Sequence, residues 1–319
     1  MPNSDRRPQT LAIIGAGSVG ATLAYACLMR GVARNVVLYD INQAKVEAEA
    51  LDISHGIQFM PMGTIQGSAD LEICRDADMV VVTAGAKQKP GQSRMELAGA
   101  TIGLMEKIIP NVQKVAPNAI IMMVTNPVDV VTLVSLKISG LPANQLFGSG
   151  TVLDSSRLRY LVAREMGVAV QNVHAYIAGE HGDSEIPLWS SALIGAAPLM
   201  DWHNVEGRSL NEARREEIAH EVVNSAYKII EGKGATNYAI GVAGARIIEA
   251  VLRDENAVLP VSSLITEYPE FGEVCMALPT IVNQNGATAR ILPPLSFGER
   301  QGLVASAKSI REAAAKFGY

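Results

Sequence analysis

The chain has 319 residues, a length that fits two domains or one large α/β unit with an appended part. Hydrophobic residues make up 48% and charged residues 18%, as in a soluble globular protein. The net charge of −5 argues against nucleic acid or an anionic membrane as the main partner, and no apolar run reaches the ~18 residues of a membrane span.

The N-terminus and the cysteines predict a cytoplasmic protein. Residues 1–9 read as a loose tail, because no apolar segment like that of a signal peptide follows their charges. Cys27, Cys74 and Cys275 are odd in number and far apart. We therefore expect small buried hydrophobic residues rather than a disulfide framework or a zinc site, and we predict no bound metal.

The first predicted unit is a strand, a tight turn and a helix. The apolar run LAII ends in Gly15-x-Gly17-x-x-Gly20, and apolar residues then recur at helical spacing. In this pattern the first glycine allows the turn, the second lets a pyrophosphate approach the backbone, and the third lets helix and strand pack closely. Free N–H groups at the helix start, at Ser18 and Val19, are expected to bind the phosphates.

Asp40 ends the next apolar run, NVVLYD, twenty residues after Gly20. Its carboxylate can accept hydrogen bonds from ribose hydroxyls and would repel the extra phosphate of NADP. A glycine triplet by itself is weak evidence, since turns use glycine for backbone reasons alone. Together with the flanking elements and this acidic residue, it predicts dinucleotide binding, with NAD favoured over NADP.

Further apolar runs at 78–84 and 119–126, and a shorter one near 146–150, alternate with helical stretches. This order predicts a parallel sheet with both faces covered, in which ligands bind beyond the carboxyl ends of the strands. The residues expected to line the cofactor site at these ends are Thr83, Ala84, Gly85 and Asn126. An ordinary turn before the following proline is the alternative for Asn126.

The second half begins with a predicted helix that carries Asp154, Arg157 and Arg159. The first two are three positions apart and share a side of the helix, whereas the two arginines are two apart and point to different sides. We therefore expect the arginines to serve different sites. A surface ion pair is the alternative for Asp154 and Arg157.

His181 lies in a polar turn, GEHGDS, between Gly179 and Gly182. The apolar alternation over 173–177 before it predicts a strand, with His174 among its polar positions. A histidine held between glycines is presented to its surroundings rather than packed in a core. A turn histidine without a role is the alternative.

The remaining signals are two helix-capping boxes, a glycine-rich break and two strands expected to be antiparallel. They are, in chain order, Ser209 with Glu212, the break GKGATNYAIG with Thr236, the strands over 258–265 and 274–283, and Ser296 with Glu299. The whole pattern predicts an α/β protein. A Rossmann domain with a doubly wound parallel sheet would occupy residues 10–150, and an α+β substrate domain would occupy 151–319.

In this order, the glycine-rich turn, AGAKQKPGQSR, VTNPVDV, LDSSRLRYL and GEHGDSEIPLW resemble the L-lactate and malate dehydrogenase family. The resemblance covers nearly the whole chain, from about Leu11 to the C-terminal helix, and the order and spacing of the motifs are more specific than any one of them. Within the family, the motifs are most similar to those of bacterial L-lactate dehydrogenases. This implies NAD-dependent interconversion of pyruvate and L-lactate.

The resemblance implies roles that the chemistry supports. His181 would be the proton donor, and Asp154 would hold its imidazole and raise its pKa. Arg157 would bind the substrate carboxylate through two hydrogen bonds, and Arg94 would close over the site and polarise the ketone. Asn126 would lie near the ketone oxygen and the nicotinamide.

By the same resemblance, the polar run 84–94 is a lid that opens for substrate and closes for reaction. Gln88 would meet the far end of the substrate, where a malate enzyme of the family has arginine to pair with a second carboxylate. A neutral glutamine leaves that carboxylate unpaired, which favours pyruvate over oxaloacetate. Lys87 or Lys89 would weaken this preference if either turned inward; solvated lid charges are the alternative. Thr236 would line the pocket opposite.

Arg159 and His174 resemble the residues that bind fructose 1,6-bisphosphate at a subunit interface of bacterial L-lactate dehydrogenases. This implies activation by that sugar bisphosphate, with a homotetramer as the assembly. An exposed arginine and a strand histidine without a ligand are the alternative.

Other functions remain as rivals. A malate dehydrogenase is disfavoured by Gln88, and a dehydrogenase of bulkier 2-hydroxy acids has no support from the lid length. A non-catalytic NAD-binding protein would be expected to have lost one of the residues His181, Asp154, Arg157 and Arg94. A methyltransferase would explain neither the GEHGDS turn nor the lid.

Overall fold

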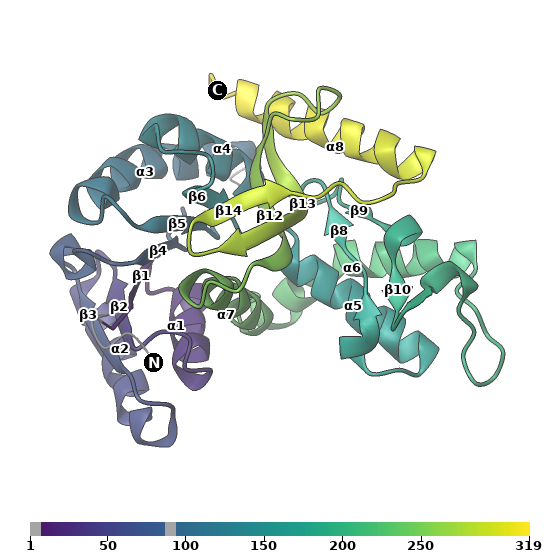
Figure 1. Cartoon of the computed structure of the whole chain (residues 1–319). Coiled ribbons are helices and arrows are strands. Elements are labelled where there is room, and N and C mark those ends of the chain that lie inside the picture. Colours follow the sequence, from purple (N-terminus) through teal and green to yellow (C-terminus); the bar gives the residue numbers. More distant parts are fainter. Residues whose placement is uncertain (1–7, 87–93) are drawn as a thin grey trace.

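The computed structural model describes residues 8–86 and 94–319, and a nine-stranded sheet runs through the middle of this part of the molecule (Figure 1). Its parallel strands are β1 (Thr10–Ile14), β2 (Asn35–Tyr39), β3 (Thr64–Ser68), β4 (Met79–Val82), β5 (Ile120–Met123) and β6 (Leu146–Gly148). Its antiparallel strands are β12 (Ala257–Ile265), β13 (Val274–Asn283) and β14 (Gly286–Arg290). The order β14-β13-β12-β6-β5-β4-β1-β2-β3 confirms the predicted Rossmann sheet and α/β class.

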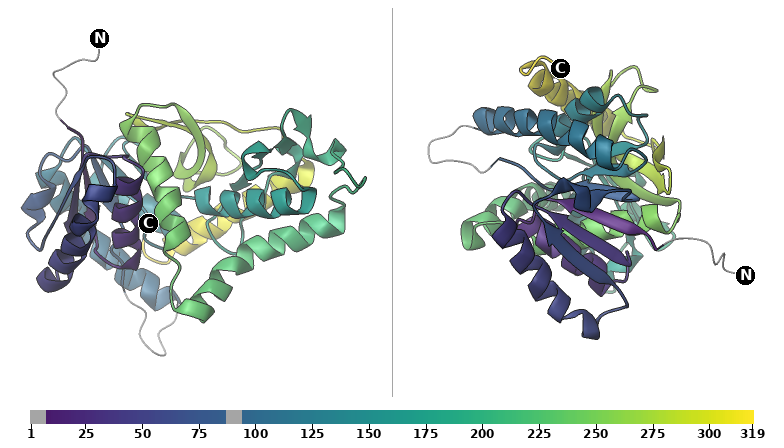
Figure 2. Two further views of the ribbon diagram at one scale, coloured as in Figure 1. Left: turned by 90° about the horizontal axis from the view of Figure 1, so that it is seen from below. Right: turned by 90° about the vertical axis from the view of Figure 1, so that its left-hand side faces the viewer.

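Helices cover both faces of the parallel strands, because successive strand residues point to opposite sides. The helices of this half are α1 (Ser18–Met29), α2 (Gln43–His55), α3 (Arg94–Val115) and α4 (Val128–Ser139). Leu11 and Ile13 pack with α1 and α2, whereas Ala12 and Ile14 pack with α3 and α4. Figure 2 shows the sheet between α2 on one side and α3 on the other.

The second half adds longer helices and several short strands. The helices are α5 (Val152–Met166), α6 (Glu212–Lys233), α7 (Tyr238–Leu252) and α8 (Phe297–Ala315). The short strands are β7 (Val173–His174), β8 (Ile177–Ala178), β9 (Ile186–Pro187), β10 (Leu193–Ile194) and β11 (Ala197–Pro198). In the described ranges, no helix has both the length and the apolar character needed to cross a membrane.

Three local expectations can be compared with the structure. The predicted antiparallel pairing is confirmed, because β12 and β13 pair over their full lengths. The capping box of Ser296 and Glu299 is also confirmed, at the start of α8. The box of Ser209 and Glu212 is wrong: Asn211 is the N-cap of α6, and its side chain accepts a hydrogen bond from the Arg214 N–H. The helix starts two residues later than the box predicts, and an asparagine directly before it satisfies the free N–H group of Arg214 instead of that of Glu212.

The sequence pattern did not predict β3, β14 or α7, nor the joining of the antiparallel strands to the Rossmann sheet. That joint pairs Ser262 of β12 with Gly148 of β6. Helix α7 packs on α1, where a Cβ at Gly241 would lie 2.7 Å from the Thr22 side chain and one at Gly244 would lie 2.8 Å from that of Leu23. One continuous sheet therefore crosses residue 150 and fixes the two halves against each other.

Candidate active site

The glycine-rich turn has the shape needed to hold a phosphate. Gly15 has a φ of 106°, a conformation that L side chains rarely adopt, and its N–H donates to the Tyr39 carbonyl at 2.7 Å. A Cβ at Gly20 would lie 1.9 Å from the Gly15 carbonyl oxygen, so strand and helix touch there. A Cβ at Gly17 would meet nothing within 4 Å. The space in front of Gly17 and the N-terminus of α1 is thus open to a pyrophosphate.

The start of α1 presents backbone donors to this space. Ser18 and Val19 are its first two residues, and Gly17 is the N-cap without a side chain of its own. No acidic side chain lies in the first turn of α1. An anion approaching this end meets free N–H groups and the positive end of the helix dipole.

Asp40 lies beside the same turn, directly after β2. Its Oδ2 accepts the Ala16 N–H at 2.9 Å and its Oδ1 accepts the Asn42 N–H at 3.0 Å. These bonds fix a negative charge next to the glycine-rich turn. The residues fit the adenosine half of NAD, whose ribose hydroxyls would donate to this carboxylate.

The residues after β4 also reach the glycine-rich turn. The Thr83 hydroxyl donates to the Gly15 carbonyl at 3.0 Å, and the Ala84 N–H donates to the Ile14 carbonyl at 2.9 Å. A Cβ at Gly85 would lie 2.8 Å from the Thr125 methyl group, so the end of β4 is held against the end of β5. Thr83 therefore braces the turn with its hydroxyl.

Asn126 follows β5 and is exposed, and its Oδ1 accepts the Val128 N–H at 3.3 Å. This bond is the turn interaction expected under the alternative for Asn126. It uses only the side-chain oxygen and does not involve the side-chain amide nitrogen. The carboxyl ends of β1, β2, β4 and β5 thus bring the predicted cofactor residues to one edge of the sheet.

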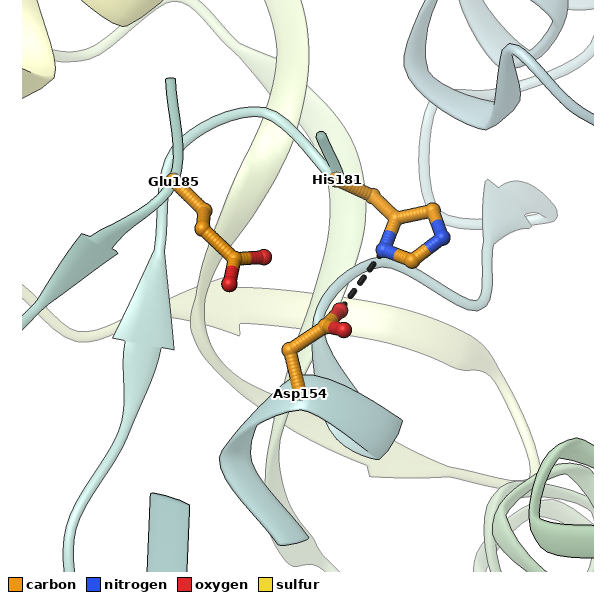
Figure 3. Close-up of side chains that lie close together, drawn as sticks. All are labelled: Asp154, His181 and Glu185. Carbon is orange, nitrogen blue, oxygen red and sulfur yellow. Dashed lines mark hydrogen bonds and ion pairs between the residues drawn. The ribbon is translucent and has the colours of Figure 1, made fainter. Parts of the chain in front are cut away.

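His181, Asp154 and Arg157 form one hydrogen-bonded chain. The Asp154 Oδ2 lies 2.6 Å from the His181 Nδ1, and its Oδ1 accepts the Arg157 Nη1–H at 2.6 Å. Asp154 is 1% exposed, whereas the His181 side chain is 26% exposed. Figure 3 shows the second ring nitrogen of His181 turned away from Asp154. That nitrogen, Nε2, is therefore available to a substrate.

The neighbours of His181 favour its charged form. Burial by itself would lower the pKa of the imidazole, but the Asp154 carboxylate outweighs it, and Asp129 and Glu185 add to the effect. The pKa of His181 is raised to about 9. Burial opposes ionisation of Asp154, yet His181 and Arg157 hold the pKa of its carboxyl below its usual value. A protonated imidazole at neutral pH follows.

Two further carboxyl groups near His181 were not found from the sequence. Asp129, 2% exposed, accepts the backbone N–H of His181 on its Oδ2 at 2.7 Å. Glu185, 8% exposed, lies with Asp154 and His181 so that one ligand atom of each is within 4.8 Å of the others (Figure 3). This spacing would admit a metal ion, but Arg157 and the imidazole already neutralise Asp154, which suits proton transfer better.

The loop that carries His181 is the tip of a short hairpin, and several elements hold it. β8 and β9 pair on either side of it, and Gly179 exchanges backbone hydrogen bonds of 2.8 and 2.9 Å with Ala277 of β13. The Ser306 hydroxyl of α8 accepts the Glu180 N–H at 2.8 Å. The Tyr227 hydroxyl of α6 donates to Asp183 at 2.9 Å. These contacts with β13, α6 and α8 hold the loop in place.

The other predicted residues lie outside this chain of bonds. Arg159 points away from Arg157, as its spacing predicts: its Nε–H donates to the Ala175 carbonyl at 2.8 Å, and its guanidinium lies over the Tyr176 ring. His174, next to Ala175, is exposed on β7. Arg159 and His174 therefore lie along the same short stretch of chain.

Thr236 is half-buried in the segment between α6 and α7 and takes no part in the His181 cluster as far as the described residues show. The segment is anchored by Asn237, whose amide donates to the Thr22 hydroxyl at 2.9 Å. Gln88 lies outside the described residues, as do Lys87 and Lys89. Arg94 is the first residue of α3, and its side chain lies outside the described part.

A Rossmann sheet with an open glycine-rich turn, an acidic residue beside it and a charged His–Asp pair near its ligand edge defines an NAD-dependent dehydrogenase. Comparison with known families identifies which one. Residues 9–148 match the NAD binding domain of the lactate/malate dehydrogenases, and residues 151–317 match their alpha/beta C-terminal domain. The chain belongs to the lactate/malate dehydrogenase family, and NAD as its cofactor is confirmed.

Individual relatives and solved structures support this family assignment. The chain is 59% identical to the L-lactate dehydrogenase of Bifidobacterium animalis subsp. lactis over the full length of both, and 43% identical to that of a Synechococcus strain over 94% of this chain and 97% of the relative. Its fold matches a lactate dehydrogenase from a Medee basin deep-sea metagenome library (TM-score 0.92, 36% identity, 98% of this chain and 100% of the other). It equally matches the minor L-lactate dehydrogenase of Enterococcus mundtii (TM-score 0.92, 36% identity, 97% and 98%).

Proposed function

We propose that the chain is an L-lactate dehydrogenase that reduces pyruvate with NADH, and that His181 exchanges the proton. The single observation that carries the proposal is the chain of bonds from His181 through Asp154 to Arg157. It supplies a proton donor and a carboxylate-binding cation from one short stretch of structure. The relatives named L-lactate dehydrogenase support pyruvate and lactate as the substrates.

The roles follow from the chemistry of each group. NADH, held by the glycine-rich turn and Asp40, would supply the hydride for C2 of pyruvate. The His181 Nε2 gives its proton to the ketone oxygen, which leaves a neutral imidazole and L-lactate. The Asp154 carboxylate holds the ring through Nδ1 and stabilises its charged form before the transfer. Arg157 binds the substrate carboxylate, a task that its planar, two-pronged guanidinium performs better than lysine would.

Selection and closure are assigned to the lid. Gln88 would leave the second carboxylate of oxaloacetate without a partner, and Arg94 would polarise the ketone as charge grows on its oxygen. Asn126 would lie beside that oxygen, and Thr236 would line the opposite wall. Malate dehydrogenase is the rival within the family, and it requires a cation where Gln88 stands.

Fructose 1,6-bisphosphate is the proposed activator, and a homotetramer is the proposed assembly. Arg159, which points to a different side of α5 from Arg157, and His174 on β7 offer N–H donors of the kind that bind phosphate. The assembly is supported by large apolar side chains left exposed on two adjacent helices: Tyr25 and Met29 on α1, and Tyr238 and Val242 on α7.

The pH dependence of pyruvate reduction tests the proton-donor role. Reduction needs protonated His181. We therefore expect kcat/KM for pyruvate to fall as the pH rises through the pKa of His181, about 9. Asp154→Asn removes the charge that raises this pKa, so the fall should begin at a lower pH. His181→Asn should lower kcat by about 10² to 10⁴, the usual contribution of a general acid. An alkaline fall that Asp154→Asn leaves in place would contradict the role.

A further inference from the structure

Asp129 is a buried acid with no part in the proposed reaction steps. It is the second residue of α4, three positions after Asn126, in an otherwise apolar stretch. It is 2% exposed, and ionised carboxylates are rarely buried without partners. The free-energy cost of burying this carboxylate is not explained by packing alone.

The hydrogen bond that Asp129 makes to the backbone of His181 points to the reason. The Asp129 Oδ2 accepts the backbone N–H of His181 at 2.7 Å, across 52 positions of sequence. The helix that begins beside Asn126 is thereby tied to the residue that carries the reactive imidazole. The bond joins an element that follows β5 to a loop of the second half.

A second buried polar group lies close to Asp129. The Asp129 Oδ1 and the Ser262 hydroxyl are both buried, and the hydroxyl is close enough to act on the carboxylate. Ser262 favours the ionised carboxylate, and it lies on β12 at the joint with β6. Asp129 therefore stands where α4, the His181 loop and the joint of the sheet meet.

We propose that Asp129 is a positioning residue for the reaction, which fixes His181 relative to Asn126 through the His181 backbone and adds negative charge behind the imidazole. This inference rests on the proposed role of His181. A carboxylate holds a backbone N–H more strongly than a neutral acceptor does, and its charge favours the imidazolium. Sub-ångström placement of the proton donor against the ketone oxygen is what such a bond secures.

The charges around the pair are consistent with this role. Burial raises the pKa of Asp129 to about 6, while Ser262 and His181 oppose the rise and Glu180 adds to it. The carboxylate is thus ionised at neutral pH. Around His181, the negative groups at neutral pH are Asp154 of α5 and Asp129 of α4, whereas Glu185 of the loop, with its pKa raised to about 8, becomes negative only at higher pH.

Two substitutions separate position from charge. Asp129→Asn keeps an oxygen acceptor for the His181 N–H and removes the charge. It should leave kcat near pH 6 within about threefold of the wild type and move the alkaline fall of pyruvate reduction to lower pH. Asp129→Ala removes both, and kcat should fall by about tenfold to a hundredfold, with the KM for NADH unchanged. Ser135→Ala, which removes a buried hydroxyl elsewhere on α4, is the matched control and should change neither kcat nor the pH of the alkaline fall.

Nuclear magnetic resonance tests the bond without relying on turnover or on the folding of a variant. The chain has 5 histidines, so labelling with ¹⁵N-histidine gives few backbone amide signals. The His181 amide should lie downfield and shift as Asp129 titrates, near the pKa of about 6.

The outcomes are distinguishable. An inactive wild type would overturn the proposed function, while the amide titration would still decide the bond. An active wild type with normal turnover in Asp129→Ala would overturn the positioning role. So would an unmoved alkaline fall in Asp129→Asn, or a His181 amide that ignores the titration of Asp129.

Discussion

Asp154 is the residue on which the site depends, because one carboxylate serves two cations. Its two oxygens hold the His181 imidazole and the Arg157 guanidinium, each at 2.6 Å. A buried carboxylate without these partners would be costly, so the charges of all three side chains are mutually required. The imidazole and the guanidinium that we propose to bind the substrate are thus placed by the same group.

Glu185 adds a second carboxyl group to this cluster and should limit stability. Burial, reinforced by Asp154, raises its pKa to about 8, although His181 and Arg157 oppose the rise. The folded chain therefore keeps a proton that the unfolded chain releases above its ordinary pKa of 4.5, and stability falls as pH rises from there through about 8.

Glu185→Gln cannot ionise and should unfold at a higher temperature than the wild type at pH 8, with a smaller difference at pH 5.5. Thermal unfolding at the two pH values measures this. Glu216→Gln, on the exposed side of α6, is the control and should give no such pH-dependent gain. An equal unfolding temperature at pH 8 would show that Glu185 is ionised in the folded chain.

Sequence patterns found His181, Asp154 and Arg157 but not Asp129 or Glu185, for a physical reason. Asp129 looks like an acid in the first turn of a helix, and Glu185 follows two polar residues, so each has an ordinary local explanation. Their role depends on burial, which comes from contacts distant in sequence. The available signal was an acid beside long apolar runs, VVTLV in one case and IPLW in the other.

At the scale of elements, the glycine-rich turn needs Gly20 and Gly17 for different reasons. A Cβ at Gly20 would strike the Gly15 carbonyl oxygen, so Gly20→Ala should lower the unfolding temperature. Gly17 has extended backbone geometry and open space, so Gly17→Ala should fold normally. The methyl group would still occupy the space proposed for the pyrophosphate and raise the KM for NADH by about tenfold or more.

Thermal unfolding and NADH titration of both variants check this division. If Gly17→Ala bound NADH as tightly as the wild type, the pyrophosphate would lie elsewhere. Gly20→Ala with an unchanged unfolding temperature would mean that α1 can move away from β1 at little cost.

At the scale of the molecule, the Rossmann half was predictable because each of its signals is local: an apolar strand, a turn and a helix in repeated order. The joint between β6 and β12 was not, since it rests on the pairing of Gly148 with Ser262, more than a hundred positions apart. Helix α7 follows a glycine-rich break and contains further glycines, which weakens its helical signal. The domain division at residue 150 stays a prediction, because the sheet is continuous there.

The most direct measurement is the rate of NADH oxidation with pyruvate and with oxaloacetate, each with and without fructose 1,6-bisphosphate. Pyruvate should have the higher kcat/KM, because Gln88 offers no charge to a second carboxylate. The bisphosphate should raise the rate of dilute enzyme with pyruvate at neutral pH. No response to the bisphosphate would remove the activator and its proposed binding by Arg159 and His174. Preference for oxaloacetate would contradict the central claim and identify a malate dehydrogenase.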